Sequence, residues 1–269
     1  MIYDCHLHTR FSGDSKASVR SQVERAISLG MKEICFTDHH DHDSWFCEDN
    51  FELDIPAYLK TLKTYQKKYK DRIRINIGIE LGLQDHLTDY FGRFDEVFGQ
   101  SFDFVIGSSH FVNCMDPYYP SYWEHHGEKE GISSFLKVSL TRAKAFYPYF
   151  DSYGHLDYVV RYAPHKDFAY SYEAFKEWID PILQVLIDHG KALECNTGGL
   201  KYGLSQPNPS SAILRRYRQM GGELITIGSD AHAPEHLGYG FDACRRLLKE
   251  CGFRWYAVFH NRRPEMVAL

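Results

Sequence analysis

The chain opens with the stretch MIYDCHLHTRFSGD (Met1–Asp14), which joins a short apolar run to three side chains that commonly bind metals. Residues 2–5 predict a short strand, and His6 and His8 follow at its end. Residues two apart on a strand point to the same face, so both imidazoles reach the same point. Asp14 lies six residues beyond His8, on a loop of Ser and Gly. Two surface histidines give the same pattern, so the interpretation depends on the rest of the chain.

Similar strand endings recur along the whole chain. Six further runs predict strands, namely Ile34–Phe36, Ile73–Ile79, Phe104–Ile106, Asp151–Tyr153, Ala192–Cys195 and Leu224–Ile227. Segments with the apolar spacing of helices alternate with them, namely Ser18–Leu29, Ile55–Lys70, Tyr90–Phe98, Gly131–Phe150, Tyr172–Gly190, Ser210–Met220 and a last helix that holds Phe241 and Leu248. Residues 111–130 predict a long irregular loop, and Trp255–Phe259 predicts a short final strand.

Seven strand–helix alternations with no change of composition predict a parallel sheet in one α/β domain that spans residues 1–269. Such a sheet is either a closed barrel or an open, doubly wound sheet. We favour a seven-stranded, TIM-like (β/α)7 barrel, because polar residues follow nearly every predicted strand. In a barrel the carboxyl ends of all strands surround one site, whereas in an open sheet the ligand crevice lies only where the strand order reverses.

Composition narrows the range of partners and locations. The length of 269 residues fits one α/β barrel, and the net charge of −5 argues against a nucleic-acid partner held by a general positive field. No apolar run approaches eighteen residues, so no membrane partner is expected. Seven cysteines, an odd number in a chain without an export signal, predict reduced thiols and a cytoplasmic location. Cys5, Cys35 and Cys195 are expected to fill the core.

Histidine and carboxylate side chains gather at the predicted strand ends. Six of the 15 histidines fall there, and with three carboxylates they give nine candidate metal ligands: His6, His8, Asp14, His39, Glu80, His110, His155, Asp230 and His232. Imidazole combined with carboxylate and no thiolate suits zinc, iron or manganese better than calcium. Nine ligands are too many for one ion and fit two or three divalent ions.

The motifs around these residues resemble those of the polymerase and histidinol phosphatase (PHP) superfamily. The motifs are His6-x-His8, Thr37-Asp38-His39, Gly78-Ile79-Glu80, Gly107-Ser108-Ser109-His110, Gly154-His155-x-Asp157 and Gly228-Ser229-Asp230-x-His232. Asn196-Thr197 and the closing Asn261-Arg262-Arg263-Pro264 resemble its histidinol-phosphatase branch. The resemblance covers the chain from end to end and implies a distorted seven-stranded barrel with a trinuclear metal centre.

The resemblance also implies how the ligands divide among three ions. The first site would hold His6, His8, Glu80 and Asp230; the second would hold Glu80, His110 and His155; and the third would hold Asp14, His39 and His232. Glu80 would bridge the first two sites. The family often has histidine at the position of Asp14.

Two basic residues resemble the groups that grip phosphate in histidinol phosphatases. Arg161 follows the His155 motif by six residues, and Lys201 follows Asn196-Thr197-Gly198-Gly199. For each of them the alternative is an ordinary surface cation. Further alternatives are open for two groups of residues. Asp38 and Asp157 either orient ligand histidines or cap loops, and Tyr118, Tyr119, Tyr122 and Trp123 either cover the substrate or pack.

The sequence therefore predicts a phosphoric monoester hydrolase that depends on divalent metals. The resemblance implies hydrolysis of L-histidinol phosphate in histidine biosynthesis by attack of a metal-activated hydroxide, with Glu80, Asp230 and Arg161 as catalytic residues. Three alternatives remain: a phosphatase for another small phosphate or a nucleotide, an exonuclease, and a non-catalytic metal-binding PHP module. The acidic net charge argues against the exonuclease, and the complete set of ligands argues against the non-catalytic module.

Overall fold

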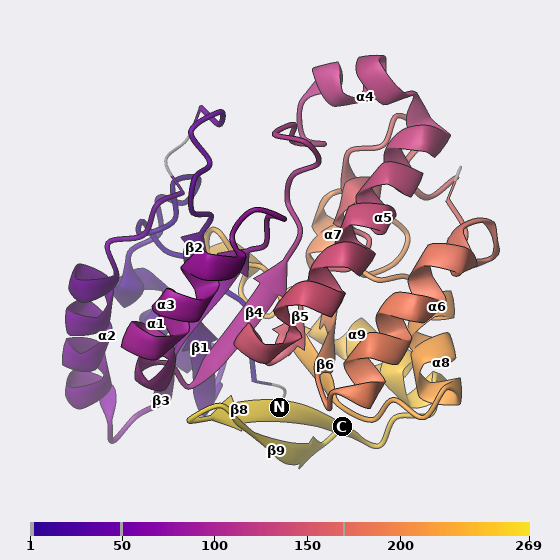
Figure 1. Ribbon diagram of the computed structural model, residues 1–269. Helices are drawn as coiled ribbons and strands as arrows, with labels where there is room; N and C mark the ends of the chain where they lie inside the picture. Colours follow the sequence, from indigo (N-terminus) through magenta and orange to yellow (C-terminus); the bar gives the residue numbers. More distant parts are fainter. Residues whose placement is uncertain (1–2, 49–50, 169) are drawn as a thin grey trace.

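The core of the protein is a sheet of seven parallel strands (Figure 1). The computed structural model describes residues 3–48, 51–168 and 170–269, so Ile2 of the predicted first strand lies outside the described residues. The strands are β1 (Glu33–Phe36), β2 (His39–His40), β3 (Arg74–Gly82), β4 (Phe104–Ser108), β5 (Ser152–Tyr153), β6 (Ala192–Asn196) and β7 (Ile225–Gly228). They pair in the order β1-β3-β4-β5-β6-β7, and β2 continues the line of β1 along β3.

Residues 4–8 close this sheet into a barrel. They lie between the first and last strands and bond to both, since the amide of Cys35 donates to the carbonyl of Asp4 (2.9 Å) and the amide of Cys5 donates to the carbonyl of Ile227 (3.0 Å). The barrel is distorted because β1 and β2 are two pieces of one strand, interrupted at Thr37 and Asp38. The predicted seven-stranded barrel is confirmed, and the open sheet is wrong.

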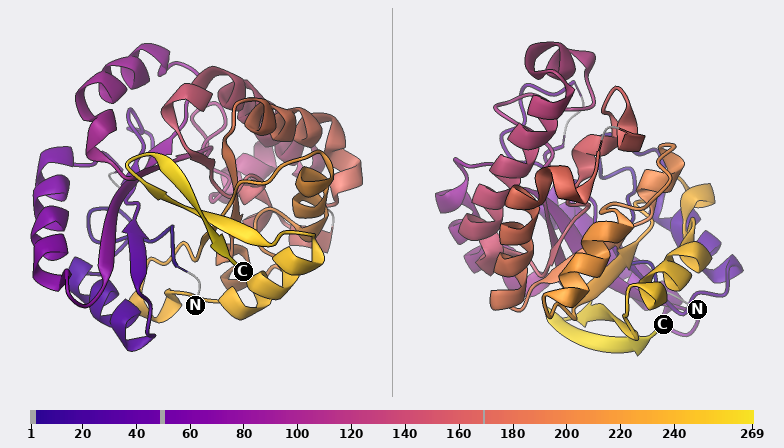
Figure 2. Two further views of the ribbon diagram at one scale, coloured as in Figure 1. Left: turned by 90° about the horizontal axis from the view of Figure 1, so that it is seen from below. Right: turned by 90° about the vertical axis from the view of Figure 1, so that its right-hand side faces the viewer.

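Helices form a ring outside the barrel, as the view from below shows (Figure 2). The ring consists of α1 (Val19–Ser28), α2 (Ile55–Tyr69), α3 (Thr88–Phe98), α5 (Glu128–Phe146), α6 (Tyr172–Asp188), α8 (Ser211–Gln219) and α9 (Phe241–Glu250). Two short helices, α4 (Pro120–His126) and α7 (Gly198–Lys201), follow the carboxyl ends of β4 and β6. Several begin where the sequence supplies a cap, because the side chains of Ser18, Asp54 and Ser171 each accept a bond from the amide three residues ahead. Their apolar faces pack on the strands.

Residues 111–130 are less irregular than the sequence predicts, because they contain the short helix α4. Pro120 stands at its first position, where the missing amide hydrogen costs no helical bond. Gly127 follows with a φ of 69°, so the chain turns there and α5 begins at Glu128 instead of Gly131. The indole of Trp123 donates to the carbonyl of Pro117 (2.8 Å), so this segment folds largely on itself.

A hairpin of β8 (Trp255–His260) and β9 (Arg263–Ala268) crosses the lower end of the barrel (Figure 2). The sequence predicted β8 but not β9. Phe259 stacks on Phe104 with ring centres 5.0 Å apart, and the amide of Arg262 donates to the carbonyl of Asp103, next to the start of β4 (2.9 Å). The hairpin therefore seals the amino ends of the strands, and the open end lies at their carboxyl ends.

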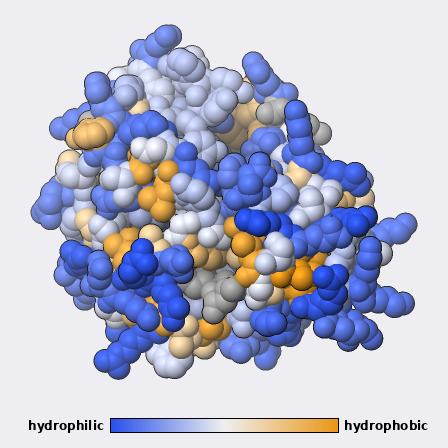
Figure 3. Space-filling view, turned by 180° about the vertical axis from the view of Figure 1, so that it is seen from behind, coloured by the Kyte–Doolittle hydropathy of each residue, from blue (hydrophilic) through white to orange (hydrophobic). Residues whose placement is uncertain are grey.

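The surface and the thiols add two observations. In the view from behind, the molecule is mostly hydrophilic, with hydrophobic residues in small separate patches (Figure 3). Within the described ranges, no helix has the length and apolar character needed to cross a membrane.

All seven cysteines are free thiols, and Cys5, Cys35 and Cys195 are buried in the core as predicted.

Candidate metal centre

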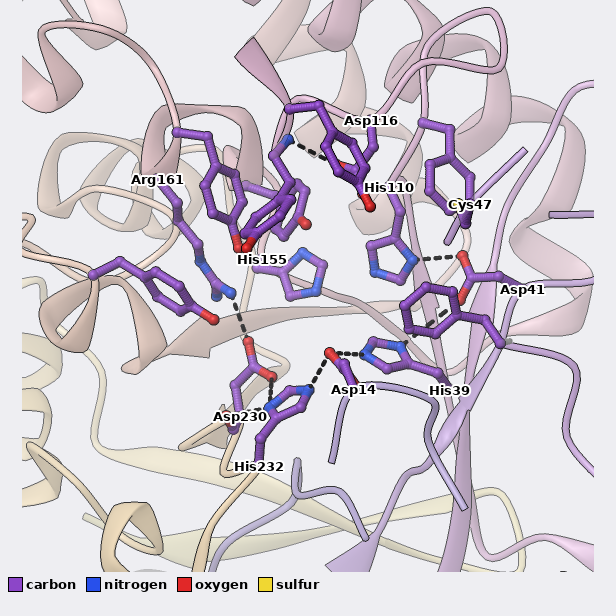
Figure 4. A pocket seen from close by; sticks show the side chains of 17 residues that line it. Asp14, His39, Asp41, Cys47, His110, Asp116, His155, Arg161, Asp230 and His232 are labelled. Atoms are coloured by element: carbon purple, nitrogen blue, oxygen red, sulfur yellow. Dashed lines mark hydrogen bonds and ion pairs between the residues drawn. The ribbon is translucent and has the colours of Figure 1, made fainter. Parts of the chain in front are cut away.

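The carboxyl ends of the strands surround a pocket of about 290 Å³ (Figure 4). Seven of the predicted site residues line it, namely Asp14, His39, His110, His155, Arg161, Asp230 and His232. The other predicted ligands, His6, His8 and Glu80, are fully buried below the lining residues and in contact with them. The fold thus brings together all nine residues that the sequence singled out, from positions 6 to 232.

Glu80 lies at the centre of this cluster, near the end of β3. Its two carboxylate oxygens lie within 4 Å of five imidazoles, those of His6, His8, His39, His110 and His155. The shortest contacts are to Nδ1 of His39 (2.8 Å) and Nε2 of His155 (2.9 Å). Ser108 on the neighbouring strand β4 donates its hydroxyl to Oε1 (2.6 Å) and so fixes the carboxylate plane. The Glu80 carboxylate alone therefore contacts all five of these imidazoles.

Asp230 and Asp14 face the remaining side of the cluster. The Oδ1 atom of Asp230 lies 3.3 Å from Nε2 of His8, and Oδ2 of Asp14 lies 3.0 Å from Nε2 of His232. The ring of His8 stacks on those of His39 and His232, with centres 4.2 and 4.1 Å away, and the rings of His39 and His232 are themselves 5.6 Å apart. These three imidazoles form a triangle beside Glu80.

The charges of the cluster stabilise one another. Burial would raise the pKa of Glu80, but His6 and His39 outweigh it and hold that pKa well below its ordinary value. Burial would likewise raise the pKa of Asp230, which Arg161 and His6 lower. Burial lowers the pKa of His8, so this imidazole is neutral at pH 7 with a lone pair available. The carboxylates are anionic, as metal coordination requires.

Several buried atoms of the cluster lack the hydrogen bonds that such atoms normally make. Among the described residues, five imidazole nitrogens here make no hydrogen bond of normal geometry, namely Nε2 of His8, Nδ1 of His39, Nε2 of His110, Nδ1 of His155 and Nε2 of His232. All but Nδ1 of His155 nevertheless lie 2.8–3.3 Å from a carboxylate oxygen of Glu80, Asp14 or Asp230. Buried polar atoms without a partner are rare, and each asks for a physical reason. Divalent ions would supply it, because imidazole nitrogen and carboxylate oxygen together suit zinc, manganese or iron.

The spacing of the donor atoms fits more than one ion. Within the described part of this cluster, four sets of three side chains each offer ligand atoms within 4.8 Å of one another: His6, His8 and Asp230; His6, Glu80 and His155; His8, His39 and His232; and His39, Asp41 and His110. The sets share His6, His8 and His39, so they form one continuous cluster. The cluster therefore offers candidate ligands for divalent metal.

The two predicted phosphate-binding residues have different surroundings. Arg161, at the end of a 3-10 helix (Tyr158–Arg161), lines the pocket and donates from Nη1 to Oδ2 of Asp230 (2.7 Å). Its Nη2 and Nε donate to the side chains of Asn196 and Asn208, so the guanidinium is held on three sides. Lys201 is not among the lining residues, and its ammonium donates to the backbone carbonyl of Asp230 (2.7 Å).

Asp38 and Asp157 hold loops, which decides between the two alternatives that the sequence left open for them. Asp38 accepts from the backbone amides and the hydroxyls of Thr9 and Ser12, and thereby shapes the loop that follows His8. Asp157 accepts from the side chain of Asn208 (2.7 Å), which in turn accepts from Arg161. Their effect on the cluster is therefore indirect.

Sequence reasoning missed three carboxylates near the pocket. Oδ1 of Asp41 lies 2.6 Å from Nδ1 of His110, Oε1 of Glu194 lies 2.7 Å from Nδ1 of His6, and Asp116 lines the pocket. The sequence did contain a sign of Glu194, because it is the one charged residue in β6 and points to the same face of the strand as Asn196. The other two lie in polar loops, where carboxylates are common.

Aromatic side chains form one wall of the pocket beside the cluster, where the ring of Tyr158 lies 5.0 Å from that of His155. Tyr118 and Tyr119 line the pocket with Tyr158, Tyr162 and Tyr202, as the hypothesis of a substrate cover expects. Tyr122 and Trp123 belong to the buried core instead, so for them the packing alternative holds. Burial raises the pKa of Asp116, which lies on this wall, to about 6.

We expect the Gly228→Ala variant to be destabilised by about 1–3 kcal/mol, the usual cost of overpacking a buried site. A Cβ at Gly228 would lie 2.3 Å from Cβ of His6 and 2.6 Å from Oε1 of Glu194, so both side chains would have to move. Thermal unfolding of chelator-treated protein measures the effect. Gly92→Ala is the control, because its Cβ would meet nothing closer than 3.6 Å inside helix α3. Equal melting temperatures of the two variants would contradict the expectation.

Comparison with known proteins connects this cluster to a family. The model of the PHP domain matches residues 4–198. The chain is 32% identical to a histidinol-phosphatase of Lactococcus lactis over 97% of this chain and 95% of that protein. It is 30% identical to a Clostridium acetobutylicum protein named "Probable histidinol-phosphatase", over 98% of each. The L. lactis crystal structure, complexed with zinc, L-histidinol and phosphate, matches with a TM-score of 0.86 over 98% of each chain at 31% identity.

Proposed function

The chain belongs to the PHP domain family, and from this premise we propose that it hydrolyses L-histidinol phosphate to L-histidinol and phosphate. The observation that carries the proposal is the Glu80 carboxylate with its five surrounding imidazoles at the floor of a pocket. The L. lactis relative, similar to this chain over nearly its whole length, was crystallised with zinc and both products of this reaction. Seven free thiols agree with a cytoplasmic enzyme.

Nine residues of this chain would hold two or three divalent ions, of zinc, manganese or iron. Glu80 would serve two ions at once, because its oxygens face His6 on one side and His110 and His155 on the other. Asp14, His39 and His232 would complete the set at the pocket edge. When bound, such ions lower the pKa of water towards neutrality, which supplies a nucleophile, and polarise the phosphoryl oxygens.

Arg161 is the residue we assign to the phosphate group. Its guanidinium is buried at the pocket wall and remains protonated, so it presents a fixed positive charge beside the cluster. Asp230, Asn196 and Asn208 hold it in place, so it needs no reorganisation when charge develops on the phosphoryl oxygens. Lys201 would act by holding the backbone of Asp230 and adding positive charge behind it.

The organic half of the substrate would lie against the aromatic wall. L-Histidinol carries an ammonium group and an imidazole ring, and Asp116 with the tyrosines of the wall offers an anion and aromatic faces to receive them. A different small phosphate ester without a positively charged group would bind this wall more weakly. Residues 1–269 would act together as one PHP-type domain, since residues 4–8 and the C-terminal hairpin both complete the barrel.

We expect the advantage of the parent protein over the Asp116→Asn variant to depend on pH. Burial raises the pKa of Asp116 from 3.8 to about 6, so the side chain is anionic above about pH 6 and neutral below it. A hydrogen bond to a charged group contributes about 1.5–3 kcal/mol, so the ratio of kcat/KM should be about tenfold or more at pH 8 and approach one at pH 5. Kinetics on L-histidinol phosphate from pH 5 to 8 measure the ratio. A ratio that does not change with pH would contradict this role.

The experiment that tests the function is phosphate release by metal-stripped protein to which Zn²⁺, Mn²⁺ or Fe²⁺ is restored. We expect metal-dependent turnover of L-histidinol phosphate that exceeds turnover of simple phosphate monoesters and nucleotides. Equal or faster turnover of the other esters would keep the phosphatase and reject the substrate. Metal binding without any turnover would support the non-catalytic alternative.

A further inference from the structure

A buried carboxylate outside the predicted ligand set is bonded to the cluster from below. Glu194 on β6 is 1% exposed and does not line the pocket, so it has no access to substrate. Its Oε1 lies 2.7 Å from Nδ1 of His6, and its Oε2 accepts from the backbone amide of His155 (2.8 Å). Asn196, two residues along the same strand, also donates to Oε2 (3.1 Å). One carboxylate thus contacts two of the predicted ligand residues.

The two ring nitrogens of His6 contact two different carboxylates. Nδ1 faces Glu194, and Nε2 faces Oε2 of Glu80 at 3.1 Å. A carboxylate accepts but does not donate, so the bond to Glu194 requires the proton of a neutral His6 ring to be on Nδ1. The lone pair of Nε2 then points at the centre, which is the arrangement that a metal ligand needs.

The partner of Nδ1 differs among the imidazoles of the cluster. Nδ1 of His8 faces the hydroxyl of Ser12 (3.1 Å), and Nδ1 of His232 faces the backbone carbonyl of Asp230 (3.1 Å), which are neutral groups. Nδ1 of His110 is bonded to an anion, Asp41 (2.6 Å), and Nδ1 of His6 is bonded to the anion Glu194 (2.7 Å). Gly228 leaves the space for this carboxylate, since a Cβ there would lie 2.6 Å from Oε1.

We propose that Glu194 is a positioning residue that fixes the ring and the tautomer of His6 and thereby sets the affinity of the cluster for metal. A carboxylate behind a histidine ligand orients the ring and makes its free nitrogen more basic, and losing it costs about 10- to 100-fold in metal affinity. The inference rests on the proposed function only in taking His6 as a metal ligand. It adds a residue that is neither ligand nor substrate contact.

The Glu194→Gln variant tests the proposal, with Glu33→Gln as a matched control. Glu33 is also a buried glutamate bonded to a histidine, His260 (2.5 Å), but it lies at the sealed end of the barrel. We expect zinc affinity, measured against a competing chelator, to fall about 10- to 100-fold in Glu194→Gln and to stay at the parent value in Glu33→Gln. At saturating zinc, kcat should fall in Glu194→Gln while KM stays unchanged, because Glu194 does not line the pocket.

Two outcomes would overturn the proposal. One is parent zinc affinity in a folded Glu194→Gln variant, and the other is an equal loss in Glu33→Gln, which would mark a general effect of removing buried charge. Nitrogen NMR of the zinc-loaded parent protein shows, without any variant, which ring nitrogen of His6 carries the proton. A proton on Nδ1 is expected, and a proton on Nε2 would overturn the proposal. The affinity comparison does not depend on the substrate, so failure to hydrolyse L-histidinol phosphate would reject the proposed function alone.

Discussion

The Glu80→Gln variant is expected to lose metal and turnover together. The carboxylate contacts five imidazoles, and a neutral amide offers a single oxygen in place of two anionic ones. Loss of a residue that only supports a ligand already costs about 10- to 100-fold, so loss of the shared carboxylate should lower kcat by well over 100-fold. Metal content per chain after gel filtration, and phosphate release from L-histidinol phosphate, measure the two effects.

Glu33→Gln serves as the control here as well, because it removes a buried carboxylate remote from the pocket. Its metal content and kcat should equal those of the parent. A Glu80→Gln variant that keeps both its metal and its turnover would contradict the central place given to Glu80. A variant that keeps its metal but loses turnover would limit the role of Glu80 to the reaction itself.

The second large effect is expected from Arg161→Lys. The guanidinium bonds to Asp230, Asn196 and Asn208 from three different nitrogens, and a single ammonium cannot span these acceptors. Loss of one fixed donor to a developing oxyanion costs about 10²- to 10³-fold in kcat, and we expect a fall of this size. Inorganic phosphate should also bind more weakly as a competitive inhibitor, because an ammonium lacks the planar fork with which a guanidinium can bind two phosphate oxygens.

Arg216→Lys is the matched control, since Arg216 pairs with Asp180 on the outer surface of the barrel (2.7 Å). It should leave kcat and phosphate inhibition unchanged. If Arg161→Lys lowers kcat without changing inhibition by phosphate, Arg161 acts mainly by holding Asp230. If neither value changes, Arg161 has no part in phosphate binding.

The strand ends are where sequence reasoning succeeded, and the reason is geometric. Parallel strands of a barrel run in the same direction, so residues that follow them meet at one end whatever their distance along the chain. His6, Glu80 and Asp230 were brought together by this rule alone. Strand β3 was predicted from the alternating isoleucines of Ile73–Ile79, and the barrel buries every residue of this strand except Arg74.

Two kinds of feature escaped prediction. Asp41 bonds to His110 because the chain folds back over the end of β3, where Gly82 has no side chain: a Cβ there would lie 1.9 Å from Oδ1 of Asp41. No local pattern in the sequence encodes such a contact. Strand β9 was missed because most of its residues are exposed, so no buried apolar pattern marks it in the sequence. Only its pairing with β8 makes it a strand.

The segment between β4 and α5 has a consequence for how this enzyme could acquire other substrates. It carries Asp116, Tyr118 and Tyr119, yet none of the nine predicted metal ligands lies on it beyond His110 at its base. Its own contacts hold it together, among them the bond from Trp123 to Pro117. Under the proposed function, this one loop supplies part of the wall that receives the alcohol and only one of the nine predicted ligands. Exchanging the loop beyond His110 is expected to change which alcohol is accepted while the predicted ligands stay in place.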